Sequence, residues 1–178
     1  MKRILLLLLL AQLFICNAQS TNGDIDITVL KEANKMGDAF VSGNYEKFAS
    51  YSHPTVVTMM GGKEHMVSEI KRSFGLLKED GIKFTDASYG EPSEIILYEG
   101  QMQCTLQQMI EMETPNGTVT ANSMLIAVSM DNGDSWYFID PSGNNITTMR
   151  KVIPTLSPML DIPVKMEPSY EEGETEED

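Results

Sequence analysis

The sequence predicts an α+β fold, a cone-shaped roll in which a curved antiparallel β-sheet packs against N-terminal helices. Two observations support it. Before residue 82, apolar residues recur at the three- and four-residue spacing of helices in three segments. After residue 82, long segments alternate apolar and polar residues between turn signals, as antiparallel strands do. Helices followed by a meander of strands pack on one face of the sheet, and a long sheet must twist and curve.

Three helices are expected in the first half of the chain. The first spans 24–42, where the apolar residues share one face. A shorter helix starts at Asn44 and ends before Pro54, because the residue that precedes a proline is driven out of the helical conformation. The third helix lies between the turn at Gly61-Gly62 and Gly81.

Strands account for most of the rest of the chain. The short apolar run at 55–60, TVVTMM, is expected to be a buried strand between the second and third helices. Pro115-Asn116-Gly117 predicts a hairpin between two long strands. A further helical segment is expected at 146–152. The strands are expected at 82–89, 94–98, 101–113, 118–130 and 135–140.

Residues 1–18 have the layout of a secretory signal peptide. Lys2 and Arg3 precede an apolar run that is too short to span a membrane, and Ala18 is a small residue suited to cleavage. We therefore expect an exported protein, periplasmic or secreted, without a membrane span. A lipid anchor on Cys16 is the alternative, and bulky Ile15 argues against it.

The folded domain is expected to span 24–165, followed by an acidic tail at 166–178. The tail holds seven acidic residues and no basic one, so it repels itself, and we expect it to be disordered. The whole chain has a formal net charge of −13. A chain with no basic face cannot displace counterions from phosphates, so nucleic acid is not expected as a partner.

The element order resembles a known superfamily. A helix followed by "GNYEKFASYSHPTVVTM", then "GGKEHMVSEIK" and the strand meander, looks like the nuclear transport factor 2-like, or ketosteroid-isomerase-like, superfamily. The resemblance covers about 27–140 and implies a cone with a pocket between helices and sheet. Members of the superfamily include isomerases, dehydratases and many non-catalytic proteins, so the fold leaves the chemistry open. Such folds often pair through the outer sheet face, and a homodimer is therefore possible.

The stretch from Ser129 to Trp136, SMDNGDSW, fits the Asp-box pattern S-x-D-x-G-x-x-W that occurs in sialidase propellers. Each part of it stabilises a hairpin: Asp131 and Ser129 can accept or donate bonds across the turn, and Asn132-Gly133 tolerates positive φ. A propeller needs several such boxes at blade spacing. We therefore interpret the box as a hairpin device.

His53 and Asp140 are the candidates for acid–base catalysis. His53 lies at a junction of elements near the expected cone mouth, although capping or pairing with a carboxylate explains it more simply. Asp140 ends the last strand and could face the cone as a base, although Asp140-Pro141-Ser142-Gly143 is also a typical turn. Neither histidine has metal-ligand spacing, so no metal site and no cofactor are expected.

Three further residues could line the cone and bind a ligand. Gln108 interrupts an apolar strand face, which a β-bulge would explain first and a wet pocket second. Met59, on the expected strand, and Trp136, on the last one, could contact an apolar ligand, although core packing is the simpler role for methionine. The leading function is non-catalytic binding of a small apolar or amphipathic ligand. The alternatives are an isomerase- or dehydratase-type enzyme and a dimeric interaction module.

Overall fold

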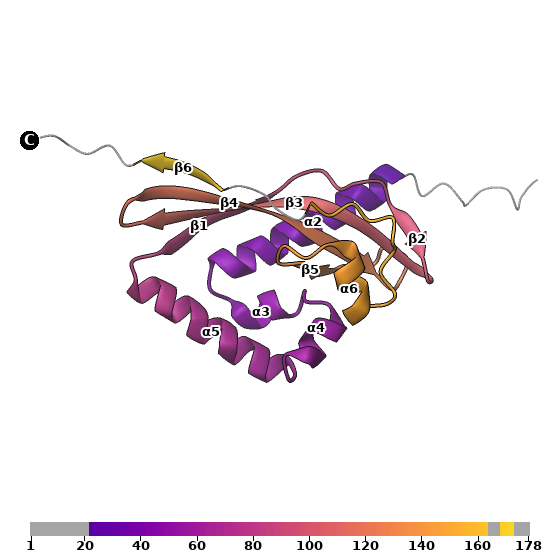
Figure 1. Cartoon of the computed structure of the whole chain (residues 1–178), viewed down its shortest axis with the longest axis horizontal. Helices are drawn as coiled ribbons and strands as arrows, with labels where there is room; N and C mark the ends of the chain where they lie inside the picture. Colours follow the sequence, from indigo (N-terminus) through magenta and orange to yellow (C-terminus); the bar gives the residue numbers. More distant parts are fainter. Residues whose placement is uncertain (1–21, 164–167, 173–178) are drawn as a thin grey trace, which may run out of the picture.

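A computed structural model describes residues 22–163 and 168–172, and its α+β architecture is the one expected (Figure 1). Helices come first and an antiparallel sheet comes after them. The helices are α2 (Asn22–Val41), α3 (Tyr45–Ala49), α4 (Pro54–Met59), α5 (Lys63–Glu79) and α6 (Ile146–Val152). The strands are β1 (Lys83–Tyr89), β2 (Ile96–Tyr98), β3 (Gln101–Thr114), β4 (Gly117–Ser129), β5 (Tyr137–Ile139) and β6 (Ser169–Glu172).

The six-stranded sheet is built around the long hairpin of β3 and β4. Its main order is β1-β3-β4-β5, while β2 also pairs with β3 and β6 also pairs with β4. The β3–β4 register runs without a break from Met102↔Ser129 to Thr114↔Gly117. The two-residue turn at Pro115-Asn116 closes this hairpin, as the sequence predicts.

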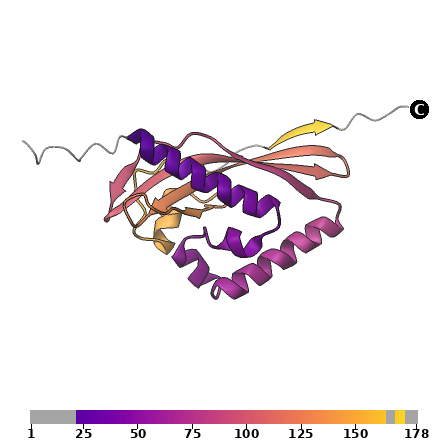
Figure 2. The same ribbon diagram turned by 180° about the vertical axis from the view of Figure 1, so that it is seen from behind.

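The N-terminal helices cover one face of the sheet. In two opposite views α2 runs along the sheet, while α3 and α5 lie farther from it (Figures 1 and 2). Val29, Ala33 and Met36 of α2 pack against alternate residues of β3 and β4 in the main core. Cys104 lies in this core with no exposed surface, and burial raises the pKa of its thiol to about 12. A thiol that stays protonated is no nucleophile, so Cys104 serves packing.

The expected strand at 55–60 is wrong, because residues 55–59 belong to helix α4 and Met60 is its C-cap. Pro54 occupies the first turn of α4, where its missing N–H removes no hydrogen bond and its fixed φ suits a helix. The Nδ1 atom of His53 accepts a hydrogen bond from the Thr55 N–H at 3.2 Å and so caps the helix start. These two signals outweigh the strand preference of the apolar, β-branched run.

A C-terminal segment covers the opposite face of the sheet. Ile153, Leu156 and Leu160 pack against Ile126 and Val128 of β4 in a second core. Figure 1 shows α6 in front of the β5 end of the sheet, whereas Figure 2 shows α2 in front. This end of the sheet is therefore buried on both faces, and only the rest of the outer face could pair with a second copy.

Gln103 fastens this segment to the sheet. Its side chain is fully buried, donates to the carbonyl of Thr155 at 2.7 Å and accepts from the N–H of Ser157 at 2.8 Å. A buried amide with both ends bonded replaces the water that these backbone groups lose on folding.

The expected disorder at 166–178 does not hold for Ser169–Glu172, which forms strand β6 beside the start of β4. Open β4 backbone groups next to the long hairpin provide hydrogen bonds for this strand in spite of its charge. The expected signal peptide at 1–18, with Cys16, lies outside the described residues. Within the described ranges, no helix combines the length and apolar character needed to cross a membrane.

Candidate functional site

A cavity of about 340 Å³ lies between the helices and the sheet, and we call it the phenylalanine cavity. Its helix side is made by three aromatic rings from three helices: Phe40, Phe48 and Phe74. Phe84 of β1 adds a fourth ring. The sheet side consists of Gln108, Ile110, Met112, Ala121 and Ser123, with Asp140 beyond the end of β5.

The four rings form one contiguous aromatic wall with Phe40 at its centre. The ring centroid of Phe40 lies 5.4 Å from that of Phe48, 5.1 Å from that of Phe74 and 4.8 Å from that of Phe84. Phe74 and Phe84 meet edge to face at 5.1 Å. Edge-to-face pairs at these distances are the favoured packing of aromatic rings, so the wall is held in shape without a ligand.

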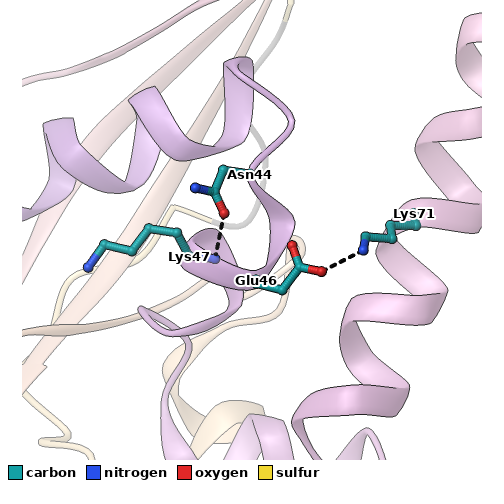
Figure 3. Close-up of polar contacts among 4 residues, drawn as sticks. All are labelled: Asn44, Glu46, Lys47 and Lys71. Atoms are coloured by element: carbon teal, nitrogen blue, oxygen red, sulfur yellow. Dashed lines mark hydrogen bonds and ion pairs between the residues drawn. The ribbon is translucent and has the colours of Figure 1, made fainter.

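Helix α5, which carries Phe74, is tied to α3 at the surface. Lys71 of α5 donates to the Glu46 carboxylate of α3 at 2.5 Å, and the side chain of Asn44 caps α3 by accepting from the Lys47 N–H at 3.1 Å (Figure 3). The Lys71 ammonium lowers the pKa of Glu46 through this hydrogen bond. An exposed ion pair adds little stability, so the packing of the rings rather than this contact holds α5 near α3.

Gln108 lines the phenylalanine cavity and belongs to a short polar network. Its amide nitrogen donates to the Tyr89 hydroxyl at 3.2 Å, and its amide oxygen accepts from the Ser123 hydroxyl at 3.1 Å. The expected bulge at Gln108 is wrong, since the β3–β4 register is continuous there. The irregularity lies instead on β1, between Phe84 and Asp86. Gln108 thus has hydrogen-bond partners on two neighbouring strands and lies in a pocket wall, which was the second of the two explanations that its sequence position allowed.

Tyr89 is held beneath Gln108 by a close approach to α2. Burial raises the pKa of Tyr89 to about 12, so its hydroxyl stays neutral. A Cβ at Gly37 would lie 2.9 Å from the Tyr89 ring and 3.0 Å from its hydroxyl oxygen. Only glycine leaves room for this ring, so Gly37 allows Tyr89 to lie where its hydroxyl can bond Gln108.

Asp140 forms the expected turn and also borders the phenylalanine cavity. One carboxylate oxygen accepts from the Ser142 N–H at 2.6 Å, which is the expected turn. The same residue lines the phenylalanine cavity and is exposed to solvent. Asp140 therefore places a charged acceptor at the solvent edge of a mostly apolar cavity.

His53 is buried, with 4% of its surface exposed, and lines neither of the two cavities described in this section. Its Nδ1 atom caps α4, while its buried Nε2 atom finds no hydrogen-bond partner among the described residues. Desolvation lowers the pKa of His53. Its backbone N–H donates to the Phe138 carbonyl at 3.2 Å, two residues before Asp140. This arrangement explains His53 as a structural residue.

Met59 and Trp136 do not belong to the cavity wall. Met59 lies on α4 with 63% of its surface exposed, because the segment is a helix rather than a core strand. Trp136 is 2% exposed and packs in the main core with Tyr51 and Phe138, as an indole on the same face as Phe138 should. Both assignments to ligand binding lack support from the cavity lining.

The Asp-box forms the hairpin turn that its residues predict. The Ser129 hydroxyl donates to Asp131 at 2.8 Å and accepts from the Gly133 N–H at 2.8 Å. The Asp131 carboxylate also accepts from the Ser135 N–H at 2.9 Å and from the Ser135 hydroxyl, and these bonds lower its pKa. Asn132 and Gly133 have φ values of 60° and 96°. The box is a structural element outside both cavities.

A second cavity, of about 530 Å³, was not expected from the sequence. It lies between residues 93–97 and the C-terminal segment at 159–161, and we call it the β2 cavity. Its existence depends on the C-terminal cover. In the sequence, the sign that a segment covers this face of the sheet is the unbroken apolar run from Met124 to Val128, which is typical of a strand buried on both faces.

The residues that sequence reasoning missed in the phenylalanine cavity are chiefly its rings. The three- and four-residue spacing places Phe40 and Phe74 on the apolar faces of their helices, but it does not say whether a buried ring fills a core or borders a cavity. Among the described residues, no group of three or more His, Cys, Asp or Glu side chains could hold a metal ion.

No protein-family profile matches the sequence. A search of curated proteins finds no significant match either.

Proposed function

We propose that this protein binds a small apolar or amphipathic molecule in the phenylalanine cavity and does not catalyse a reaction. One observation carries the proposal: a wall of four phenylalanine rings faces a sheet surface with only a few convergent polar groups. Small-molecule sites are typically concave, mostly apolar and of a few hundred Å³, with a small number of placed polar groups.

The polar groups indicate which end of such a ligand lies where. Gln108 and Ser123 lie on the sheet wall, and Asp140 lies at the solvent edge. An apolar ring system would contact the phenylalanines, while a hydroxyl or amine at its end would donate to the Asp140 carboxylate. A carboxylate on the ligand would be repelled there.

Among the described residues that line the cavity, Asp140 is the one carboxylate, and no histidine, lysine or cysteine accompanies it. A catalytic acid or base must reach the reacting atoms from the pocket wall. His53 borders neither cavity, and its Nδ1 atom already caps α4. Asp140 is exposed and accepts a turn hydrogen bond. These features favour binding over an isomerase- or dehydratase-type reaction.

We also propose that the chain is a secreted or periplasmic member of the nuclear transport factor 2-like superfamily. The support is the element order, the quoted segments around Asn44 and Gly62, and the signal-like residues 1–18. In that proposal the sheet and its helices enclose a cone, and the phenylalanine cavity is the cone's interior. A homodimer would have to use the part of the outer sheet face that the C-terminal segment leaves open.

A matched pair of variants tests the binding proposal. The probe is 2-naphthol, a neutral bicycle with one hydroxyl, titrated into the full chain and followed by amide NMR shifts. Ala121→Phe puts a ring into the cavity from β4, whereas Thr120→Leu changes the neighbouring residue, which does not line the cavity.

Saturable binding is expected in the wild type and in Thr120→Leu. Ala121→Phe should weaken it by about tenfold or more, which corresponds to about 1.4 kcal/mol of binding free energy. If the wild type shows no saturable shift, or if both variants bind alike while remaining folded, the proposal is wrong.

A further inference from the structure

The β2 cavity has walls that are fixed independently of the phenylalanine cavity. On one side, the Ser93 N–H donates to the Thr105 carbonyl at 2.7 Å and the Ser93 hydroxyl accepts from the Thr105 N–H at 3.0 Å. On the other side, the hydrogen bonds of Gln103 to Thr155 and Ser157 anchor the C-terminal segment that carries Met159. The cavity is therefore preformed, which spares a ligand the entropy of ordering its site.

Two large apolar side chains are exposed at this cavity. Leu97 is 72% exposed and Met159 is 67% exposed, and both border the β2 cavity from opposite walls. Ile95 and Leu160 continue the apolar surface inward. Single exposed apolar residues are ordinary, but a grouped set around a cavity marks a surface that a ligand can cover.

The charges at the β2 cavity have one sign. Glu94 lies on one wall and Asp161 on the other, both exposed, and no lysine or arginine of the described residues lines the cavity. Neither carboxylate has an ion pair with another described residue. The whole chain is acidic as well, with a net charge of −13, so its field attracts cations to this site.

We propose that the β2 cavity is a second binding site, which takes a small amphiphilic cation such as an organic amine. The ligand's apolar body lies against Leu97, Met159 and Leu160, and its ammonium group lies at the carboxylates of Glu94 and Asp161. The volume of about 530 Å³ is sufficient for a molecule of this class. This site does not depend on what the phenylalanine cavity binds.

Three probes with one apolar body separate charge from hydrophobicity: 4-phenylbutylamine, 4-phenylbutan-1-ol and 4-phenylbutyrate. Each is titrated into the full chain at low salt and followed by amide NMR. The amine should bind most tightly and the carboxylate most weakly, with shifts at 93–97 and 159–161. Added salt should weaken only the charge-dependent part.

Variants locate the effect. The double substitution Glu94→Gln with Asp161→Asn should weaken the amine by about tenfold, to the level of the alcohol, because it removes the charge attraction alone. Leu97→Ser should weaken all three probes. Ala121→Phe, which blocks the phenylalanine cavity, should leave the amine-induced shifts at 93–97 and 159–161 unchanged.

The proposal is overturned if the carboxylate binds as well as the amine, or if the amine shifts only residues of the phenylalanine cavity. It is also overturned if the double variant, with an unchanged fold by NMR, shows the same amine-induced shifts at 93–97 and 159–161 as the wild type. The substituted side chains are exposed, so little effect on folding is expected.

Discussion

Replacing Gln103 by leucine tests how the C-terminal segment is held. Leucine has a similar size but cannot bond the Thr155 carbonyl or the Ser157 N–H, which Gln103 reaches at 2.7 and 2.8 Å. Both partners are backbone groups, and Ser157 is fully buried, so water cannot easily replace the amide. The variant therefore leaves the Ser157 N–H and the Thr155 carbonyl without a hydrogen-bond partner, beside an apolar side chain.

The loss of the hydrogen bonds to Thr155 and Ser157 lowers the free energy of unfolding. Each contributes about 1 kcal/mol, and a buried polar group left without a partner costs about 1–3 kcal/mol, so we expect a loss of about 2–4 kcal/mol in unfolding free energy. For a chain of this size that loss lowers Tm by about 5–15 °C. Urea denaturation followed by circular dichroism measures the change at constant m-value.

Gln107→Leu is the matched control, because Gln107 lies on the same strand and its side chain makes one long hydrogen bond to the described residues, at 3.4 Å to Asn122. It should cost less than about 0.5 kcal/mol, as surface changes usually do. If Gln103→Leu lowers the unfolding free energy as little as Gln107→Leu does, the side chain of Gln103 does not hold the C-terminal segment, and the reasoning is refuted.

Three other substitutions have defined outcomes. His53→Asn keeps a capping acceptor but cannot titrate. Because the folded-state pKa of His53 lies below its usual 6.5, the wild type should lose stability relative to the variant as pH falls from about 7 to 5. Parallel curves of stability against pH would contradict this. Ser129→Ala removes the bond to Gly133 and should cost about 1–2 kcal/mol by urea denaturation, so an unchanged midpoint would count against the hairpin account. Gly37→Ala should cost about 1–3 kcal/mol through its clash with Tyr89, which calorimetry checks and an unchanged Tm would refute.

The elements with strong local signals were predictable. The Asp-box hairpin could be predicted from residue types, because Asn132 and Gly133 tolerate positive φ and Ser129 and Asp131 bond across the turn. The long β3–β4 hairpin could be predicted from alternation and its turn. In such places local chemistry and tertiary structure agree, which is why sequence reasoning succeeds there.

Predictions failed where two local signals competed or where a partner was distant in sequence. At 55–60 the β-branched run favoured a strand, but the cap at His53 and the proline at the first helical turn decided for α4. With that helix, Met59 moved to the surface. The position of Gln108 depends on its hydrogen bond to Tyr89, which lies 19 positions earlier in the sequence. Alternation alone could not supply that contact, so a bulge was the simpler explanation.

The C-terminal cover shows a further limit. Ile153 and Leu156 have no clean period between the prolines, so nothing in their spacing places them on the outer sheet face. The clearer signal was on β4, where both faces are apolar at Met124–Val128. The β2 cavity, which depends on this cover, could not be predicted without it.

Native mass spectrometry of the protein purified from its own host tests the central claim most directly. We expect the wild type and Thr120→Leu to carry a small-molecule adduct that is released on denaturation, and Ala121→Phe to lack it, because the added ring occupies the phenylalanine cavity. Two results would contradict the assignment of ligand binding to this cavity. One is an adduct retained in folded Ala121→Phe that also carries Leu97→Ser, which weakens binding in the β2 cavity. The other is a wild type that carries no adduct and also fails to bind 2-naphthol.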